Sequence, residues 1–231
     1  MTELSVARIN QENARRMRRN LFDHHYAWSG WSGEHYRRKW RSARRFFVGF
    51  KPALFQGNNR TFVVDVGTAV HEAPYGVRLA VSEDKKLINL MSARMSIEGK
   101  EVTIKSIQGE PIVDAQGYQI SRTNLGALRE FEKLNGPAAN CLFKEIKMQA
   151  KRLGYTIVIL QKPQFTASYI CTMITRTWKK RLTALSKKLG DPLEAERRIR
   201  TEIRERLVKF YQKIADAEKM EDCGEHWQLK L

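Results

Sequence analysis

Residues 60–107 contain four short apolar segments: RTFVVDVG (60–67), GVRLAVS (76–82), LINLMSARM (87–95) and KEVTIKSI (100–107). The segments are rich in β-branched residues, and KEVTIKSI alternates polar and apolar positions, which is typical of strands. Short connections join them, and closely spaced strands of this kind favour an antiparallel meander. The next stretch, GEPIVDAQGYQI (109–120), predicts a further hairpin or a loop.

Helical patterns flank these strands on both sides. Apolar residues recur there at helical spacing, and the continuous apolar run YTIVILQ (155–161) predicts a buried strand among the later helices. We expect helices over residues 4–22, 33–45, 124–134, 137–153, 166–189 and 192–220. This order predicts an α+β fold, in which helices flank a mixed sheet with an antiparallel meander. The expected segments are a basic aromatic helical part (1–50), an α/β core (51–190) and a long C-terminal helix (191–231).

The composition is that of a globular protein. The chain has 231 residues, of which 42% are hydrophobic, enough for one full-sized domain. No apolar run reaches the roughly 18 residues of a membrane helix, and the N-terminus lacks the apolar core of a secretory signal. Three widely spaced cysteines favour a reducing compartment, so we expect a cytoplasmic protein with no membrane partner. Cys223 and His226 form a C-x-x-H pair, but a zinc site needs two further ligands and no second pair is evident.

The net charge of +17 is unevenly distributed along the chain. Residues 1–60 carry 13 Lys or Arg against 4 Asp or Glu, whereas residues 61–120 carry 6 against 8. Residues 121–165 carry 8 against 3, and residues 166–231 carry 15 against 10. A basic field concentrated in one segment indicates a polyanionic partner. The distribution therefore predicts binding of nucleic acid, without separating DNA from RNA.

The basic segment also contains aromatic residues. Arginine binds phosphate through its planar fork of donors, and exposed aromatic rings stack on unpaired bases. Tyr36, Trp40 and Phe47 recur at helical spacing, so we expect them to anchor the second helix in the core. The predicted nucleic-acid-binding residues are Arg15, Arg16, Arg18, Arg19, Trp28, Trp31, Arg37, Arg38, Lys39, Arg41, Arg44 and Arg45. The alternatives for this face are an acidic protein partner, an anionic membrane surface, or water alone.

The strand region resembles RNase H-like nucleases, and most closely their RuvC and YqgF branch. The resemblance lies in FVVDVGT (62–68) followed by GVRLAVSED (76–84), and in FKEIKMQAKRLGYTIVILQKP (143–163), which is similar to that family's first helix and fourth strand. It covers about residues 60–165, with residues 96–121 as a hairpin-like insertion. It implies an RNase H-like strand order, in which Asp65 at the sheet centre is the catalytic carboxylate and the ligand of Mg²⁺ or Mn²⁺.

Three functions are therefore open at this point. The first is a nucleic-acid-binding component of a nucleoprotein assembly or of a mobile-element or phage process. The second is a metal-dependent nuclease or resolvase that uses Asp65. The third is an acetyltransferase-like protein, because that fold also has a meander, a helix and a buried strand. It cradles pyrophosphate on a Gly-rich loop, which neither RTNLGALREF (122–131) nor KLNGPAAN (133–140) contains. The apolar stripe of the last helix is a candidate for a protein partner or for self-association.

Overall fold

A computed structural model describes residues 33–58, 60–67, 76–83, 86–109, 112–113, 119–121, 124–163 and 178–231. The expected helix over 4–22 lies outside these residues. The chain forms two compact units, one made of the residues up to Gln161 together with Glu221–Leu231, and the other made of Lys162–Met220. The two compact units meet at Gln161 and Met220, and the expected segment boundaries at residues 50 and 190 stay a prediction.

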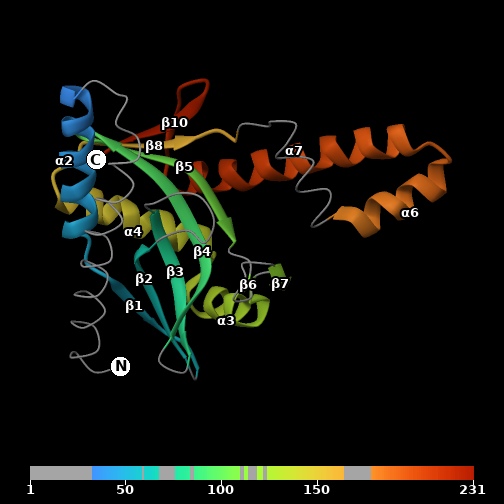
Figure 1. The fold of residues 1–231 in the computed structure, drawn as a ribbon, viewed down its shortest axis with the longest axis horizontal. Coiled ribbons are helices and arrows are strands. Elements are labelled where there is room, and N and C mark those ends of the chain that lie inside the picture. The colour runs from blue at the N-terminus through green and yellow to red at the C-terminus, as the bar shows by residue number, and fades with distance from the viewer. Residues whose placement is uncertain are drawn as a thin grey trace. The chain divides into compact units, whose positions relative to one another are not determined.

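The first unit is built on an eight-stranded mixed sheet, drawn in Figure 1. Its strands follow the order β1-β2-β3-β4-β5-β8-β10-β9, and β5 and β8 form its parallel pair. The expected α+β class and the antiparallel meander from β2 to β5 are confirmed. The bounds are Ala53–Gln56 (β1), Thr61–Gly67 (β2), Gly76–Glu83 (β3), Lys86–Glu98 (β4), Glu101–Gly109 (β5), Ile157–Gln161 (β8), Glu221–Asp222 (β9) and His226–Lys230 (β10).

The stretch after β5 forms a small hairpin of its own. β6 (Ile112–Val113) and β7 (Gln119–Ser121) pair in a separate two-stranded antiparallel sheet. This agrees with the hairpin expected over residues 109–120.

The crossover between the parallel strands sets the place of β8 in the sheet. β5 leads through α3 (Leu125–Asn135) and α4 (Ala138–Arg152) to β8, which pairs directly with β5. Strands β3, β4 and β5 therefore separate β8 from β2, the strand that carries Asp65. Val102, Ile104 and Ile107 of β5 are buried, as expected for a strand inside the sheet and not for an insertion. The RNase H-like strand order stays a prediction.

The C-terminal residues add two strands that the sequence reasoning missed. The last helix, α7 (Pro192–Ala217), is followed by β9 and β10, and β10 lies between β8 and β9. Trp227 of β10 is buried and is the register partner of Leu160. The segment 191–231 is thus a helix followed by a hairpin, and its hairpin belongs to the first unit.

The C-terminal half of helix α2 (Gly33–Gly49) contacts the end of α4 and the residues that follow it. The hydroxyl of Tyr155 donates a hydrogen bond of 2.6 Å to the carbonyl of Ser42. The rings of Phe46 and Tyr155 pack edge to face, 5.6 Å apart. The amide of Gln149 both accepts from the Lys51 N–H and donates to the Lys51 carbonyl, at 3.2 and 3.0 Å. These contacts fix the C-terminal half of α2 on the first unit.

Helix α3 packs on the opening strands of the sheet. The ring of Phe131 meets Phe55 and Phe62 edge to face, at 5.4 and 5.3 Å. The side chain of Asn124 caps the helix by accepting from the Ala127 N–H at 3.1 Å. Phe62 and Phe131 are fully buried, so this aromatic group closes one end of the core.

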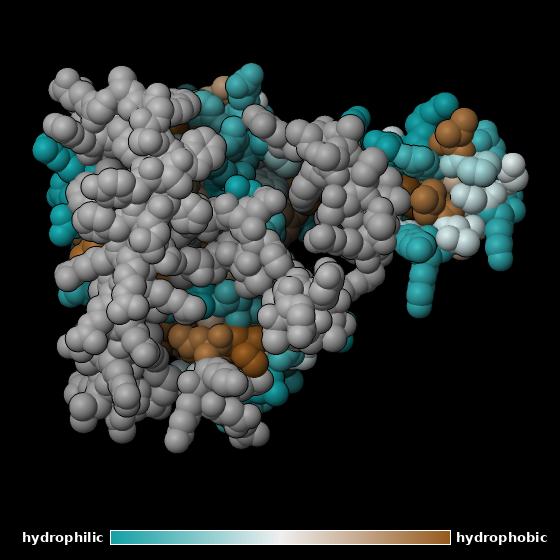
Figure 2. Space-filling view, viewed as in Figure 1, coloured by the Kyte–Doolittle hydropathy of each residue, from teal (hydrophilic) through white to brown (hydrophobic). Residues whose placement is uncertain are grey.

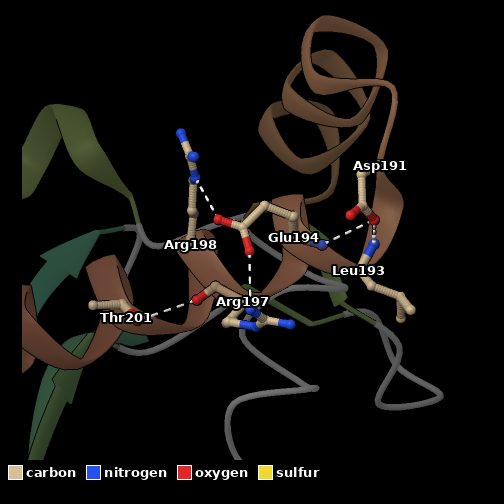
Figure 3. Close-up of polar contacts among 6 residues, drawn as sticks. All are labelled: Asp191, Leu193, Glu194, Arg197, Arg198 and Thr201. Carbon is tan, nitrogen blue, oxygen red and sulfur yellow. Dashed lines mark hydrogen bonds and ion pairs between the residues drawn. The ribbon is translucent and has the colours of Figure 1, made fainter.

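The second unit contains a hairpin of two helices, α6 (Lys179–Leu189) and α7. Gly190 ends α6 in the left-handed conformation, and the Asp191 carboxylate caps α7 by accepting from the Leu193 and Glu194 N–H groups (Figure 3). The hairpin core contains Trp178, Ile199 and Ile203, with Leu182, Leu185 and Leu207 packed against them. The expected helix over 166–189 is confirmed for Lys179–Leu189, and its earlier part lies outside the described residues. No helix in the described ranges is long and apolar enough to span a membrane.

Candidate functional site

The parallel pairing of β5 with β8 ends halfway along β5. Their parallel register runs from Glu101–Ile157 to Ile104–Leu160, whereas β5 continues to Gly109 (Figure 1). A β-bulge lies at the same point, because the register with β4 passes from Arg94–Ser106 to Met95–Ile104 and leaves Lys105 as an extra residue. Bulges bend a strand and end its pairing on one side. The edge of β5 from Lys105 to Gly109 therefore has no register partner on β8.

An ionic network crosses the neighbouring strands. Both carboxylate oxygens of Asp65 on β2 accept from Arg78 on β3, from Nε at 2.7 Å and from the second terminal nitrogen at 3.2 Å. The other terminal nitrogen of Arg78 donates to the Asn89 side-chain oxygen at 2.7 Å. Asp65 is fully buried and Arg78 is 9% exposed. The arrangement is a bidentate, charge-assisted pair held inside the sheet.

This geometry gives Asp65 a role different from the one that the RNase H-like resemblance implies. Both carboxylate oxygens of Asp65 are already engaged by Arg78, whose positive charge would repel a metal ion bound beside it. The described residues also contain no group of three or more His, Cys, Asp or Glu side chains that could hold a metal ion. The contacts of Asp65 support an ion pair that joins β2 to β3, and its assignment as a ligand of Mg²⁺ or Mn²⁺ stays a prediction without support from its surroundings.

A second polar pair lies beside this network and was not anticipated. Arg94 on β4 and Ser106 on β5 are register partners next to the bulge. The Nε of Arg94 and the Oγ of Ser106 are buried, and neither has a hydrogen-bond partner among the described residues. The sequence alone gives no signal for this pair, because an Arg and a Ser in alternating strands read as ordinary surface positions.

The basic residues of α2 are only partly within the described side chains. Arg41, Arg44 and Arg45 are exposed, as expected for a binding face. Phe47 is buried, which confirms it as an anchor. The remaining expected positions cannot be placed by their side chains: Arg15, Arg16, Arg18, Arg19, Trp28 and Trp31 lie outside the described residues, and for Tyr36, Arg37, Arg38, Lys39 and Trp40 the structure describes only their place in α2.

Helix α6 carries a basic surface that the sequence reasoning did not single out. It contains five basic and no acidic residues, and Lys179, Lys180, Lys187 and Lys188 are all exposed. The guanidinium of Arg181 instead pairs with Glu202 at 2.8 Å and lies over the Trp178 ring, 5.1 Å from its centroid. Figure 2 shows hydrophilic residues over much of this hairpin. The signal in the sequence was local: KKRLTALSKKL has basic residues at both ends and no acid between them.

Helix α7, by contrast, has arginines that are neutralised within the helix. Glu194 pairs with Arg197 at 3.2 Å and with Arg198 at 2.8 Å, as Figure 3 shows. Glu202 pairs with Arg206 at 2.8 Å. Such pairs at three- and four-residue spacing leave less net field for a ligand. The two helices of one hairpin thus differ in their suitability for a polyanion.

The two cysteines within the described residues, Cys141 and Cys223, lie in surroundings that favour a structural role. The Cys141 thiol donates to the Asn135 carbonyl at 3.0 Å, and burial raises its pKa above the ordinary thiol value, so it is not an activated nucleophile. Cys223 is exposed in the turn between β9 and β10, where its N–H donates to the His226 carbonyl at 2.9 Å. The C-x-x-H spacing therefore reflects a tight turn.

The first turn of α4 already has an acidic partner. The carboxylate of Glu132 accepts from the Ala138 N–H at 3.1 Å. An anion such as pyrophosphate would meet this negative charge at the helix N-terminus. The missing Gly-rich loop and the position of Glu132 therefore both argue against a pyrophosphate cradle at this place.

Comparisons of the chain with known protein families, curated proteins and solved structures gave no significant match.

Proposed function

We propose that this chain binds nucleic acid, because its basic charge is concentrated in the N-terminal segment and on helix α6. The N-terminal 60 residues carry 13 basic against 4 acidic residues, and Arg41, Arg44 and Arg45 are exposed. Helix α6 supplies four further exposed lysines.

The salt dependence of binding separates specific charge contacts from general charge. We would measure Kd for labelled 20-mer DNA and RNA, single- and double-stranded, from 50 to 300 mM salt. The logarithm of the binding constant falls linearly with the logarithm of the salt concentration, and each lost phosphate contact makes this decline shallower by about 0.9 for duplex DNA. Replacing Arg41, Arg44 and Arg45 by Gln should flatten the slope, as should replacing Lys179, Lys180, Lys187 and Lys188.

The matched control is Arg197→Gln with Arg198→Gln, because both arginines pair with Glu194, which offsets one of their two charges. We expect this variant to change the slope least for each charge removed. If the salt dependence weakens by the same amount per removed charge in all three variants, binding depends only on net charge, and the proposed binding surfaces on α2 and α6 are wrong.

A further inference from the structure

Helix α4 carries a row of lysines on the side that faces away from the core. Lys144, Lys147 and Lys151 follow one another at intervals of three and four residues, so they lie on one side of the helix, over about 10 Å of its length. Lys144 and Lys151 are exposed. The single acidic residue of this helix, Glu145, is 8% exposed and belongs to the buried side. The outer side of α4 therefore presents positive charge.

The C-terminal ends of α4 and α2 meet, and an arginine from each helix contacts the other. The guanidinium of Arg152 donates to the Gly49 carbonyl at the end of α2 and to the Gln149 side-chain oxygen. A terminal nitrogen of Arg45 lies over Gly154, only 3.4 Å from the position that a Cβ there would occupy. The C-terminal end of a helix carries partial negative charge, which both arginines offset. The outer side chains of α2 and α4 thus belong to one surface.

The two stretches that build this surface have a strong excess of basic residues. Residues 41–58 contain four basic and no acidic residues, and residues 138–161 contain four basic residues against Glu145. The turn between β4 and β5 marks a border, because its Lys100 carbonyl accepts from the Thr156 N–H at 2.9 Å and its neighbours Glu98 and Glu101 are exposed acids. We define the α2–α4 surface as Arg41, Arg44, Arg45, Lys144, Lys147 and Lys151. A concentrated positive field of this kind selects a polyanion.

The aromatic rings of the described residues provide no exposed platform beside these charges. Every Phe, Tyr and Trp whose side chain the structure describes is buried or half-buried. Beside the surface, the rings of Phe46 and Tyr155 pack against each other in the interior. Proteins that bind unpaired strands stack the bases on exposed rings. A surface of charges alone instead favours a duplex, whose phosphates are about twice as dense along the axis as those of a single strand.

We propose that the α2–α4 surface binds the phosphate backbone of a nucleic-acid duplex without reading its sequence. The inference rests on the proposed nucleic-acid binding, and it names the form of the nucleic acid and adds α4 to the contact. Lys144 and Lys151 pair with phosphates next to those that the arginines of α2 hold. Contacts to phosphate fix the position of a duplex but carry no sequence information. Duplex DNA and duplex RNA share this chemistry, so both are probes for the test.

The test variant is Lys144→Gln with Lys151→Gln. Its matched control is Arg129→Gln with Lys133→Gln, which removes two exposed charges from α3 of the same unit. Fluorescence anisotropy gives Kd for labelled DNA and RNA duplexes and for the matching single strands over a range of salt. Loss of two phosphate contacts should make the decline of log K with log salt shallower by about 1.8 for duplex DNA, with a clearly smaller change in the control. All four positions are exposed, so an unchanged Tm shows that each variant is folded.

The wild-type protein supplies the second readout, which concerns the form of the nucleic acid. It should bind each duplex more tightly than the matching single strand, and two duplexes of unrelated sequence should bind alike. Tighter binding of the single strands, or a strong preference for one duplex sequence, would overturn the inference. Loss of affinity for only one of the DNA and RNA duplexes in the α4 variant would support it and identify that duplex as the partner.

Failure of the inference differs from failure of the proposed function. If wild type binds none of these nucleic acids, the proposed function is wrong and the inference is wrong with it. If wild type binds, but the α4 variant and the α3 control weaken the salt dependence equally, α4 is not part of the contact. Nucleic-acid binding then stands, and the inference does not.

Discussion

The pair of Asp65 and Arg78 should be one of the most sensitive points of the sheet. Asp65→Ala leaves the Arg78 guanidinium buried, with Asn89 as its remaining partner in this network. Removing one member of a buried, hydrogen-bonded ion pair lowers the free energy of unfolding by about 3–5 kcal/mol. Asn89→Ala removes a single hydrogen bond to a charged donor, so its effect should be smaller, about 1.5–3 kcal/mol. Urea unfolding followed by fluorescence measures both values.

The double variant Asp65→Leu with Arg78→Met supplies the control. It removes both charges and keeps most of the volume, and replacements of this kind are often neutral or stabilising. We expect the double variant to be clearly more stable than Asp65→Ala. The reasoning fails if Asp65→Ala is tolerated within about 0.5 kcal/mol, the range of an ordinary surface substitution. A stabilisation of wild type by Mg²⁺ or Mn²⁺ that Asp65→Ala abolishes would instead restore the metal site.

Three further predictions concern the packing and protonation of the first unit. Phe131→Ala should lower the free energy of unfolding by about 3–5 kcal/mol because its ring is fully buried, whereas the exposed Leu134→Ala should change it by at most about 0.5 kcal/mol. Tyr155→Phe removes the hydrogen bond to the Ser42 carbonyl, so urea unfolding should show a loss of about 0.5–1.5 kcal/mol, with faster hydrogen exchange in α2. Burial raises the pKa of the Glu145 carboxyl above its ordinary value of 4.5, so the stability of the folded protein is highest below pH 4.5 and falls as pH rises through the folded-state pKa. The variant Glu145→Gln should therefore have a higher Tm than wild type at pH 7, and the two Tm values should converge below pH 4.5. Equal Tm values across this range would contradict the assignment.

The strands and helices followed from local sequence patterns because periodicity is a local property. RTFVVDVG (60–67) and KEVTIKSI (100–107) predicted strands that end within one or two residues of the bounds of β2 and β5. The pairing of β8 with β5 was not visible, because register depends on which buried face meets which, and residues 96–121 resemble an insertion as much as a central strand. HWQLK is short and its two apolar residues, Trp227 and Leu229, alternate with polar ones over only five positions, so the sequence did not predict β10.

The candidate site shows the same limit. The exposed arginines of α2 were predictable, because charge density can be counted along the chain. The occupation of Asp65 by Arg78 was not, since the two residues lie 13 positions apart and meet only through the register of β2 and β3. A carboxylate at a strand end has the same appearance in a sequence whether its partner is a metal ion or an arginine.

The interior position of β10 has a consequence for how this chain folds. Its partner β8 ends at Gln161, so some 65 residues must be synthesised before the sheet can be completed. The α6–α7 hairpin lies within that interval and forms its core from neighbouring residues, which shortens the effective loop that has to close. Until His226–Lys230 arrives, the apolar edge of β8 is open to other strands and is a site for aggregation. A ribosome stalled before residue 226 should therefore hold a nascent chain that a chaperone recognises through β8.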